Sequence, residues 1–246
     1  MKLGIMQSYF FPYLGYFQLI SHVDSFILYE HVSFRKKSWI TRNRILDKRA
    51  NSPVFINVPV QKKSSSNSIG NTLINNSTDW RNKIINLIFF NYKKALFFDE
   101  IFPVVEKIVN EKYASIHEYN ARIIINICEC LEIKTKITYQ NENYILMEKE
   151  LEVLAKENSS EIKTQRIFEI CDREGANTYV NPVGGAELYD KTHFTANEIQ
   201  LHFVETSGYE YNQFKGDFEP HLSIIDVLMH NGIEKTKEMI HNYKVV

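Results

Sequence analysis

Residues 2–17 of the sequence read KLGIMQSYFFPYLGYF. The apolar run at residues 3–6 predicts a buried strand, and apolar residues at helical spacing resume after Pro12. The aromatic turn between them is typical of an α/β sheet, whose ligand sites lie where a strand ends and the next helix presents free backbone N–H groups. Each ring taken alone could instead pack the helix on the sheet, but the cluster as a whole predicts the wall of a pocket.

The composition is that of an ordinary globular chain, with 246 residues of which 44% are hydrophobic and 24% charged. This length fits one large domain, with or without a small appendage. The 29 basic and 30 acidic residues nearly cancel, so we expect neither a nucleic-acid partner nor attraction to a membrane surface, and any bound anion must be held locally. The sequence has no apolar run as long as a membrane-spanning helix, which predicts a cytoplasmic protein.

Hydrophobic periodicity predicts alternating strands and helices along the chain. Besides the first strand, apolar runs predict strands at residues 25–29, 54–60, 135–139, 177–180 and 199–204. Helical spacing and capping residues predict helices from Asp79, from Pro103 and from Ser115 to about residue 131, and again at residues 148–156, 163–174 and 222–230. We therefore predict a single three-layer α/β domain over residues 1–246, with a mainly parallel sheet, helices on both faces and a helical insertion at about residues 79–131.

The three cysteines, Cys128, Cys130 and Cys171, cannot all be paired with one another. The first two lie two residues apart in a predicted helix, which places them on different faces, and no histidine accompanies them at a metal-binding spacing. We expect unpaired, buried thiols in a reducing compartment and no metal site. The sequence has no Walker loop, G-x-G-x-x-G turn or nucleophile elbow, so it offers no cofactor motif, and several large enzyme classes are disfavoured.

Residues 35–44, RKKSWITRNR, hold the densest positive charge in the sequence. Such a run is most often a solvated face, and a nucleic-acid site is disfavoured because no second basic stripe accompanies it. Trp39 interrupts the run, however, and Arg42 and Arg44 alternate along one side. Guanidinium groups beside an aromatic ring suit a phosphate attached to a base or a sugar, so we predict a phosphate-binding role for this segment.

Two further segments have the chemistry of anion sites. Lys163, Thr164 and Arg166 lie in the first turn of a predicted helix, where cations oppose the helix dipole unless an anion binds there. Three exposed polar side chains are an equally good interpretation. Gly184 and Gly185 can turn their backbone N–H groups toward an anion, although a Gly-Gly pair more often forms a simple turn.

The C-terminal part of the sequence holds candidate acid–base residues. Asp226 and His230 are spaced i,i+4 on a predicted helix. They form either a charge pair on a solvated face, which is the more common case, or an acid–base pair facing a cleft. His221, just before this helix, is another candidate base, or else a capping residue.

Five segments, in this order, resemble the WbqC-like family of bacterial proteins. They are MQSYFFPYLGY at residues 6–16, SWITRNRI at 38–45, DWR at 79–81, KTQR at 163–166, and FEPHLSIIDVL at 218–228 followed by Asn231 and Gly232. The sequence departs from the family at Ser8, where proline is usual, and at Glu30 and His31, where acidic residues are usual. If an acid at this place is catalytic, Glu30 keeps that role and His31 changes its pH response.

The resemblance implies an enzyme of bacterial surface-polysaccharide (O-antigen) synthesis, and a glycine-transferase role has been suggested for some members. The implied reaction is acyl or aminoacyl transfer from an activated donor to the amino group of a nucleotide-linked amino sugar. His221 or Glu30 would deprotonate the attacking amine, and Asn43 or the Gly184–Gly185 amides would stabilise the oxyanion. The substrate would be held by Gln7, Tyr9, Phe10, Tyr13, Tyr16, Trp39, Arg42, Arg44, Lys163, Thr164, Arg166, Gly184 and Gly185.

A fainter likeness concerns nucleotidylyltransferases of the adenylyl-transfer type. Residues 13–16, YLGY, stand where these enzymes carry an H-x-G-H motif after their first strand, and residues 163–166 are similar to their phosphate-binding helix start. This likeness predicts a Rossmann-like fold of that type, but both histidines are tyrosines here, which disfavours the usual adenylyl transfer. Two alternatives to acyl transfer therefore stay open: a non-catalytic sugar-nucleotide-binding or scaffold protein, and a nucleotidyltransferase-like enzyme. The oligomeric state is also left open.

Overall fold

A computed structural model of the protein describes residues 1–61, 67–154, 162–207, 209–214 and 216–246. Its centre is a six-stranded sheet in the order β5-β2-β1-β6-β7-β8, in which the first five strands are parallel and β8 is an antiparallel edge. This arrangement confirms the predicted α/β fold with a mainly parallel sheet. The strands are β1 (Lys2–Met6), β2 (Ser25–Leu28), β5 (Lys136–Thr138), β6 (Thr178–Pro182), β7 (Gln200–Thr206) and β8 (Tyr243–Val245).

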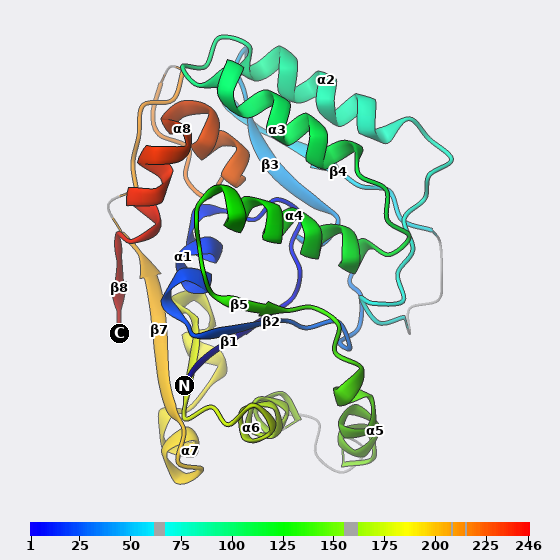
Figure 1. Ribbon diagram of the computed structural model, residues 1–246, viewed down its shortest axis with the longest axis vertical. Helices are drawn as coiled ribbons and strands as arrows, with labels where there is room; N and C mark the ends of the chain where they lie inside the picture. Colours follow the sequence, from blue (N-terminus) through cyan, green and yellow to red (C-terminus); the bar gives the residue numbers. More distant parts are fainter. Residues whose placement is uncertain (62–66, 155–161, 208, 215) are drawn as a thin grey trace.

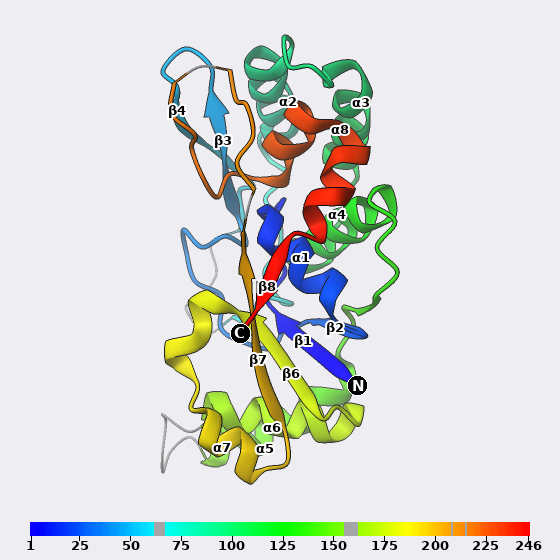
Figure 2. The same cartoon turned by 90° about the vertical axis from the view of Figure 1, so that its left-hand side faces the viewer.

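Helices cover both faces of the sheet (Figure 1). α5, α6 and α7 lie on one face, α1, α4 and α8 lie on the other, and α2 and α3 are stacked further out. The hairpin of β3 and β4 stands beside α2 and α8, at the end of the molecule away from α5, α6 and α7 (Figure 2). The remaining elements are α1 (Leu14–His22), β3 (Arg42–Asp47), β4 (Ser52–Asn57), α2 (Trp80–Tyr92), α3 (Phe98–Asn110), α4 (Ile116–Cys130), α5 (Ile145–Leu154), α6 (Ile162–Glu174), α7 (Lys191–Ala196) and α8 (Ile224–Ile240).

The central strands are buried on both sides, so their side chains alternate between two hydrophobic cores. Leu3 and Ile5 of β1 belong to the core that α5 and α6 cover, together with Ile170. Gly4, between them, faces the other core, where an added Cβ would lie 2.7 Å from Cδ2 of Phe26. The absence of a side chain at this position lets the Phe26 ring lie directly over β1.

The turn between β1 and α1 is fixed by buried polar side chains. Asn43 on β3 donates hydrogen bonds from Nδ2 to the carbonyls of Phe10 and Phe11, at 3.0 and 2.6 Å. Ser223, just before α8, donates from its hydroxyl to the same Phe11 carbonyl at 2.9 Å. These bonds hold Phe11 at a φ of 40°, a left-handed conformation that bulky residues adopt only where the surrounding structure imposes it.

Asn120 of α4 supports the same turn from another side. Its Nδ2 donates to the carbonyls of Ser8 and Ile40, both at 2.8 Å, and its side chain is fully buried. Because a buried carbonyl without a donor is costly, this amide ties the exit of β1 to the segment that leads into β3.

The strand predicted at residues 54–60 does not belong to the main sheet. It forms β4 and pairs in antiparallel register with β3, so that Arg44 lies opposite Phe55. The sequence pattern does not reveal β3 because its charged residues alternate with the buried Asn43 and Ile45 instead of forming an apolar run. The basic segment therefore enters the fold as part of a strand pair.

The structure also refines three details of the sequence prediction. α3 begins at Phe98, so Pro103 lies inside the helix rather than in its first turn. The range of α8 runs past Gly232, but Gly232 itself has non-helical angles (φ 69°, ψ −177°), so a first helical segment ends there, close to the predicted end, and a second follows the kink. The edge strand β8 is too short to be recognised from periodicity.

The cysteines are free, and Cys128 and Cys171 are buried, as the sequence predicts, whereas Cys130 is half-buried. Within the ranges that the structure describes, no helix combines the length and the apolar character needed to cross a membrane. The same ranges hold no group of three or more His, Cys, Asp or Glu side chains placed to bind a metal ion.

Replacing Asn120 by alanine should destabilise the protein, because the carbonyls of Ser8 and Ile40 would stay buried without a donor. At about 1–3 kcal/mol for each unpaired group, we expect the free energy of unfolding in urea to fall by roughly 2–5 kcal/mol. Asn126→Ala, on a partly exposed side of the same helix, is the matched control and should change it by less than about 0.5 kcal/mol. Equal losses in the two variants would contradict the structural role of Asn120.

Candidate functional site

A cavity of about 410 Å³ opens at the carboxyl ends of β1, β6 and β7. The strand order reverses here, because β2 lies on one side of β1 and β6 on the other. In parallel α/β sheets the loops diverge at such a switch point and leave a crevice for a ligand. The cavity is lined by Tyr9, Tyr13, Gly15, Trp39, Asn43, Arg44, Pro182, Val183, Gly184, Val204, Glu205, Thr206 and His221.

The N-terminus of α1 forms part of the cavity wall. Tyr13 occupies the N-cap position without a side-chain hydrogen bond, and the first turn of the helix holds no acidic residue. The N–H of Tyr16 donates to the Tyr13 carbonyl at 3.0 Å, but the positive end of the helix dipole lies here, so this part of the wall attracts an anion. Gly15 lets the helix approach the end of β7, since an added Cβ would clash with Oγ1 of Thr206.

Arg44 brings a positive charge to the cavity wall. Its Nη1 lies 3.5 Å from Oε1 of Glu219, and its Nη2 lies 3.4 Å from the carbonyl oxygens of Pro220 and His221. These contacts are long, and both partners of the ion pair are partly exposed. The guanidinium therefore keeps the capacity to bind a further anion from the cavity side.

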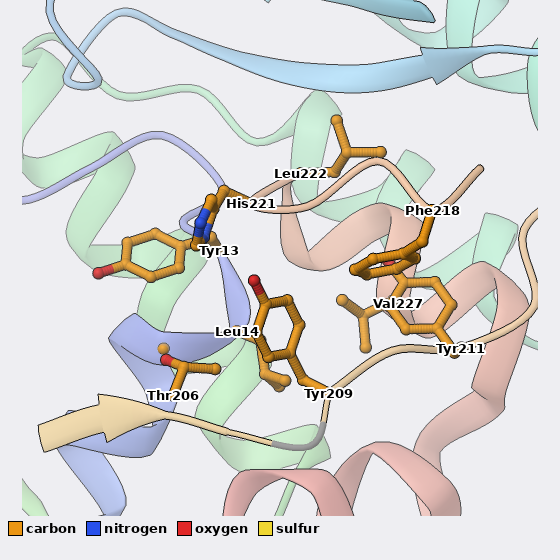
Figure 3. A pocket seen from close by; sticks show the side chains of 10 residues that line it. Tyr13, Leu14, Thr206, Tyr209, Tyr211, Phe218, His221, Leu222 and Val227 are labelled. Carbon is orange, nitrogen blue, oxygen red and sulfur yellow. The ribbon is translucent and has the colours of Figure 1, made fainter. Parts of the chain in front are cut away.

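His221 and Glu205 supply titratable groups. His221 has a φ of 57°, and its exposed ring meets the ring of Tyr13 edge-on, with centroids 6.1 Å apart (Figure 3). Glu205 lies near the end of β7, and its side chain is exposed. A base and a carboxylate are thus both within the lining of the cavity.

The tyrosines of the β1–α1 turn act as hydrogen-bond donors at neutral pH. Burial raises the pKa of Tyr9, and burial together with the neighbouring Tyr9 raises the pKa of Tyr13 to about 12. Their hydroxyl groups therefore stay protonated and can donate to acceptors on a ligand.

A small hollow of about 10 Å³ adjoins the cavity next to His221 (Figure 3). Rings from three segments surround it, among them Tyr13, Tyr209 and Phe218, and Thr206 lies at its border with the cavity. Its volume is that of about one water molecule. It extends the cavity without adding room for a second ligand.

The structure brings together predicted residues from four separate segments. These segments are the β1–α1 turn, the approach to β3 with the strand itself, the loop after β6 and the approach to α8. The predicted residues that line the cavity are Tyr9, Tyr13, Trp39, Asn43, Arg44, Gly184 and His221.

Three predicted residues serve the turn itself. Phe10 and Tyr16 are fully buried in the core, and the Tyr16 hydroxyl donates to the carbonyl of Gln7 at 2.8 Å. Asn43 lines the cavity, but the turn carbonyls already use its amide nitrogen twice. It positions the aromatic turn rather than offering a donor to an oxyanion.

The predicted anion site on α6 lies apart from the cavity, on the opposite face of the sheet from α1. Arg166 pairs through two bonds with Glu148 of α5, with Nε–Oε1 at 2.5 Å and Nη2–Oε2 at 2.9 Å. Glu148 also accepts a hydrogen bond from Tyr29. Lys163 is exposed and Thr164 is half-buried on the same helix. The guanidinium of Arg166 is therefore already paired with a carboxylate of the protein.

Two further predicted residues lie outside the cavity lining. Arg42 lies over the ring of Phe55, with Cζ 4.4 Å from the ring centroid. Gly185 packs against the side-chain amide of Asn181, which would clash with an added Cβ. Gly185 therefore makes room within its own loop, while the neighbouring Gly184 reaches the cavity.

Glu30 belongs to a separate polar cluster around the buried His117 of α4. Nε2 of His117 donates to the carbonyl of Tyr139 at 2.6 Å, which leaves Nδ1 to accept from the Ser8 hydroxyl at 3.0 Å. A Glu30 oxygen lies 3.7 Å from Nε2. Burial lowers the pKa of His117, although the Tyr139 carbonyl and Glu30 oppose this shift. The ring is therefore neutral at physiological pH.

His31 also lies outside the cavity lining. Its Nε2 is 2.7 Å from the backbone carbonyl of Asn141, and its ring meets that of Tyr29 edge-on. The pair of residues that departs from the family pattern, Glu30 and His31, thus lies beyond the end of β2 and not at the switch point.

Asp226 is fully buried, whereas the sequence favours a solvated face for it. It accepts hydrogen bonds from the hydroxyls of Tyr92 and Tyr211 and from Nε2 of Gln213. His230 lies 3.9 Å away, and burial lowers its pKa. This cluster fastens the segment after β7 to α8, and the same segment carries the ion-pair partner of Arg44.

The sequence does not reveal six of the cavity residues, which are Gly15, Pro182, Val183, Val204, Glu205 and Thr206. All but Gly15 lie near or just beyond the carboxyl end of β6 or β7. Both strands are recognisable in the sequence, but their positions in the sheet next to β1 are not. The sequence therefore could not predict that the ends of β6 and β7 lie together at the cavity.

The profile of the WbqC-like protein family matches residues 7–238. The chain belongs to the WbqC-like family. This confirms the resemblance seen in the sequence, and the matched range includes every residue that lines the cavity. The WbqC-like chain is also 33% identical over 236 residues, 95% of each chain, to the Mycobacterium tuberculosis protein described as "Uncharacterized protein Rv1507c". No solved structure matches the WbqC-like chain described here.

The two basic residues Arg44 and Lys163 should behave differently. Arg44→Ala removes a guanidinium from the cavity wall, and we expect affinity for a nucleoside diphosphate such as UDP to fall by about 10- to 100-fold in calorimetry. Lys163→Ala, at an exposed position on α6, is the control and should leave the affinity unchanged. A larger loss in the Lys163 variant would move the anion site to α6.

The buried His117 makes stability depend on pH. Its folded-state pKa is lowered, so below about pH 6.5 the unfolded chain binds a proton that the folded chain resists. The free energy of unfolding should therefore fall as the pH decreases from about 7 to 5. His117→Gln should flatten this slope, while His193→Gln, at an exposed position on α7, should not. Identical slopes in the wild type and the His117 variant would refute the assignment.

Proposed function

We propose that this WbqC-like protein is a cytoplasmic enzyme of bacterial surface-polysaccharide synthesis. It transfers an acyl or aminoacyl group, with glycyl as one candidate, from an activated donor to the amino group of a nucleotide-linked amino sugar. The observation that carries the proposal is the cavity at the switch point, where aromatic rings, an uncapped helix N-terminus, a guanidinium and a carboxylate meet. Each of these features suits one part of such a substrate.

The positive features suit the diphosphate of the substrate. The N-terminus of α1 offers backbone N–H groups and the positive end of its dipole, and Arg44 offers a planar fork of donors. Glu219 is a partly exposed partner of Arg44, so a diphosphate can replace or share it at little cost. The hydroxyl groups of Tyr9 and Tyr13, which also line the cavity, are further hydrogen-bond donors.

The negative feature suits the amino group. Glu205 is a carboxylate in the lining of the same cavity, and it can attract the ammonium form of an amino sugar. His221, whose ring is exposed to the cavity, is the base for the reaction. The ammonium first loses one proton to solvent, because only the neutral amine is nucleophilic. As the amine nitrogen attacks the acyl carbon, His221 takes a second proton from it. The bond between the acyl carbon and the leaving group then breaks, and His221 returns this proton to the leaving group.

The oxyanion that forms on the acyl carbonyl needs hydrogen-bond donors. Gly184 is in the lining, and its backbone N–H group is the candidate donor, because the start of α1 is assigned to the diphosphate. Asn43, whose amide is already engaged, is not assigned this role.

Two observations bear on the alternative functions. Of the two tyrosines that replace the histidines of nucleotidylyltransferases, Tyr16 is buried in the core and bonded to the backbone, which disfavours nucleotidyl transfer. A non-catalytic sugar-nucleotide-binding protein would use the same cavity, so only an assay of turnover separates it from a transferase.

The test is to incubate the protein with a panel of nucleotide-linked amino sugars and activated acyl and aminoacyl donors. Mass spectrometry should show a gain on the sugar that equals the mass of the acyl group minus one hydrogen. Thermal stabilisation by nucleotide sugars with no mass gain across the whole panel would contradict transfer and leave a binding protein. Release of pyrophosphate from a nucleoside triphosphate would instead indicate nucleotidyl transfer.

His221→Gln should lower the rate of acyl transfer by about 100-fold or more, because it removes the base and keeps a polar side chain of similar size. Binding of the nucleotide sugar, measured by calorimetry, should stay within about threefold of wild type. His193→Gln, an exposed histidine on α7, is the matched control and should retain full activity. Full activity in the His221 variant would assign the base elsewhere.

A further inference from the structure

The outer side of the β3–β4 hairpin carries a series of arginine and aromatic side chains. Arg44 on β3 lies opposite Phe55 on β4, so the two share one side of the hairpin. The guanidinium of Arg42 lies 4.4 Å from the centroid of the Phe55 ring. Trp39, just before β3, lies 6.5 Å from Phe55 between centroids, with its plane tilted by 30°. Two neighbouring rings and a guanidinium therefore lie together on this side of the hairpin.

Both rings are open to solvent. Trp39 is 41% exposed and Phe55 is 40% exposed, whereas the other tryptophan, Trp80, is only 3% exposed. Aromatic side chains stabilise a protein chiefly when they are buried, so two adjacent exposed rings next to a cavity are typical of a binding surface.

Arg42 keeps its charge available. Within the part of the chain that the structure describes, no carboxylate pairs with it, and its Nε has no hydrogen-bond partner. A guanidinium beside an aromatic ring can also interact with the ring of a ligand, because arginine stacks on aromatic faces. Its positive charge also favours an electron-rich or anionic ligand.

This surface continues directly from the cavity. Trp39 and Arg44 are part of the cavity lining, and Cζ of Arg44 lies 5.9 Å from the Trp39 ring. The cavity volume of about 410 Å³ is near the lower end of the range of about 300–1,000 Å³ for small-molecule sites. With the sugar and the diphosphate in the cavity, the base of a nucleotide sugar would extend past Trp39 onto the hairpin.

We propose that Trp39, Phe55 and Arg42 form a stacking platform for the nucleobase of the substrate, at the mouth of the cavity. The proposal rests on the proposed function in that it assumes a nucleotide-linked substrate. Stacking uses the π face that every base has, so the platform supplies affinity without reading which base is bound. The transferase should therefore accept its sugar on more than one nucleoside diphosphate.

The rings can be tested by binding of UDP, ADP, GDP and inorganic pyrophosphate to the full chain. Trp39→Ala and Phe55→Ala should each weaken binding of all three nucleotides by about tenfold or more and leave pyrophosphate binding within about twofold. Phe90→Ala, which removes a ring that is 63% exposed on α2, is the matched control and should change neither.

Fluorescence gives an independent readout. The chain has two tryptophans, and a stacked base should quench the exposed Trp39 but not the buried Trp80. Trp39→Phe should abolish the quenching by nucleotides while it keeps their affinity within about threefold, because a ring is still present. Loss of affinity without loss of quenching would contradict stacking on Trp39.

The platform is overturned if the Trp39 and Phe55 alanine variants bind nucleotides as the wild type does, if they lose pyrophosphate binding equally, or if no nucleotide binds. A preference of more than about tenfold for one base would also overturn it. These failures differ from a failure of the proposed function. If nucleotide binding depends on the rings but no acylated product forms, only the transferase is refuted. If acylated product forms and the ring variants bind nucleotides as the wild type does, only the platform is refuted.

Discussion

The buried hydrogen bonds to the β1–α1 turn are the constraint on which the site depends. Backbone carbonyls that leave a strand within a hydrophobic core must find donors, and here the amides of Asn43 and Asn120 and the hydroxyl of Ser223 supply them. These donors come from β3, α4 and the approach to α8. The same bonds therefore fix the aromatic turn, the hairpin and the approach to His221 relative to one another, and a cavity assembled from distant segments keeps one shape.

A second buried group extends this support to the charged side of the cavity. An isolated carboxylate in a core is costly, but Asp226 receives hydrogen bonds from three neighbouring side chains. Two of these donors, Tyr211 and Gln213, lie on the segment between β7 and α8, so the carboxylate fastens that segment to the helix. Glu219 on the same segment is thereby held beside Arg44. A residue that resembles a catalytic acid in the sequence thus acts by positioning the partner of the cavity's cation.

The sequence predicts local elements well and their arrangement less well. The strand at residues 3–6, the aromatic turn and the strands that become β2, β6 and β7 follow from apolar runs and turn residues, which are local properties. The order of those strands depends on packing between distant segments, so the adjacency of Glu205 and Gly184 could not be predicted. The role of Arg166 was equally hidden, because its partner Glu148 lies on a neighbouring helix. Charged and polar residues suited to a binding site were recognisable in the sequence. The sequence did not show whether a neighbouring side chain already pairs with each of them.

The balance of charge in the cavity bears on the kind of substrate it suits. A nucleoside triphosphate carries several negative charges, and proteins that bind one usually add cations or a metal ion to a helix N-terminus. Here the lining combines the start of α1 and Arg44 with the carboxylate of Glu205. The cations expected from α6 lie on the other face of the sheet, where Arg166 is paired with a carboxylate. Such a lining suits a molecule in which an ammonium group lies one sugar ring away from a diphosphate, as it does in the proposed nucleotide-linked amino sugar.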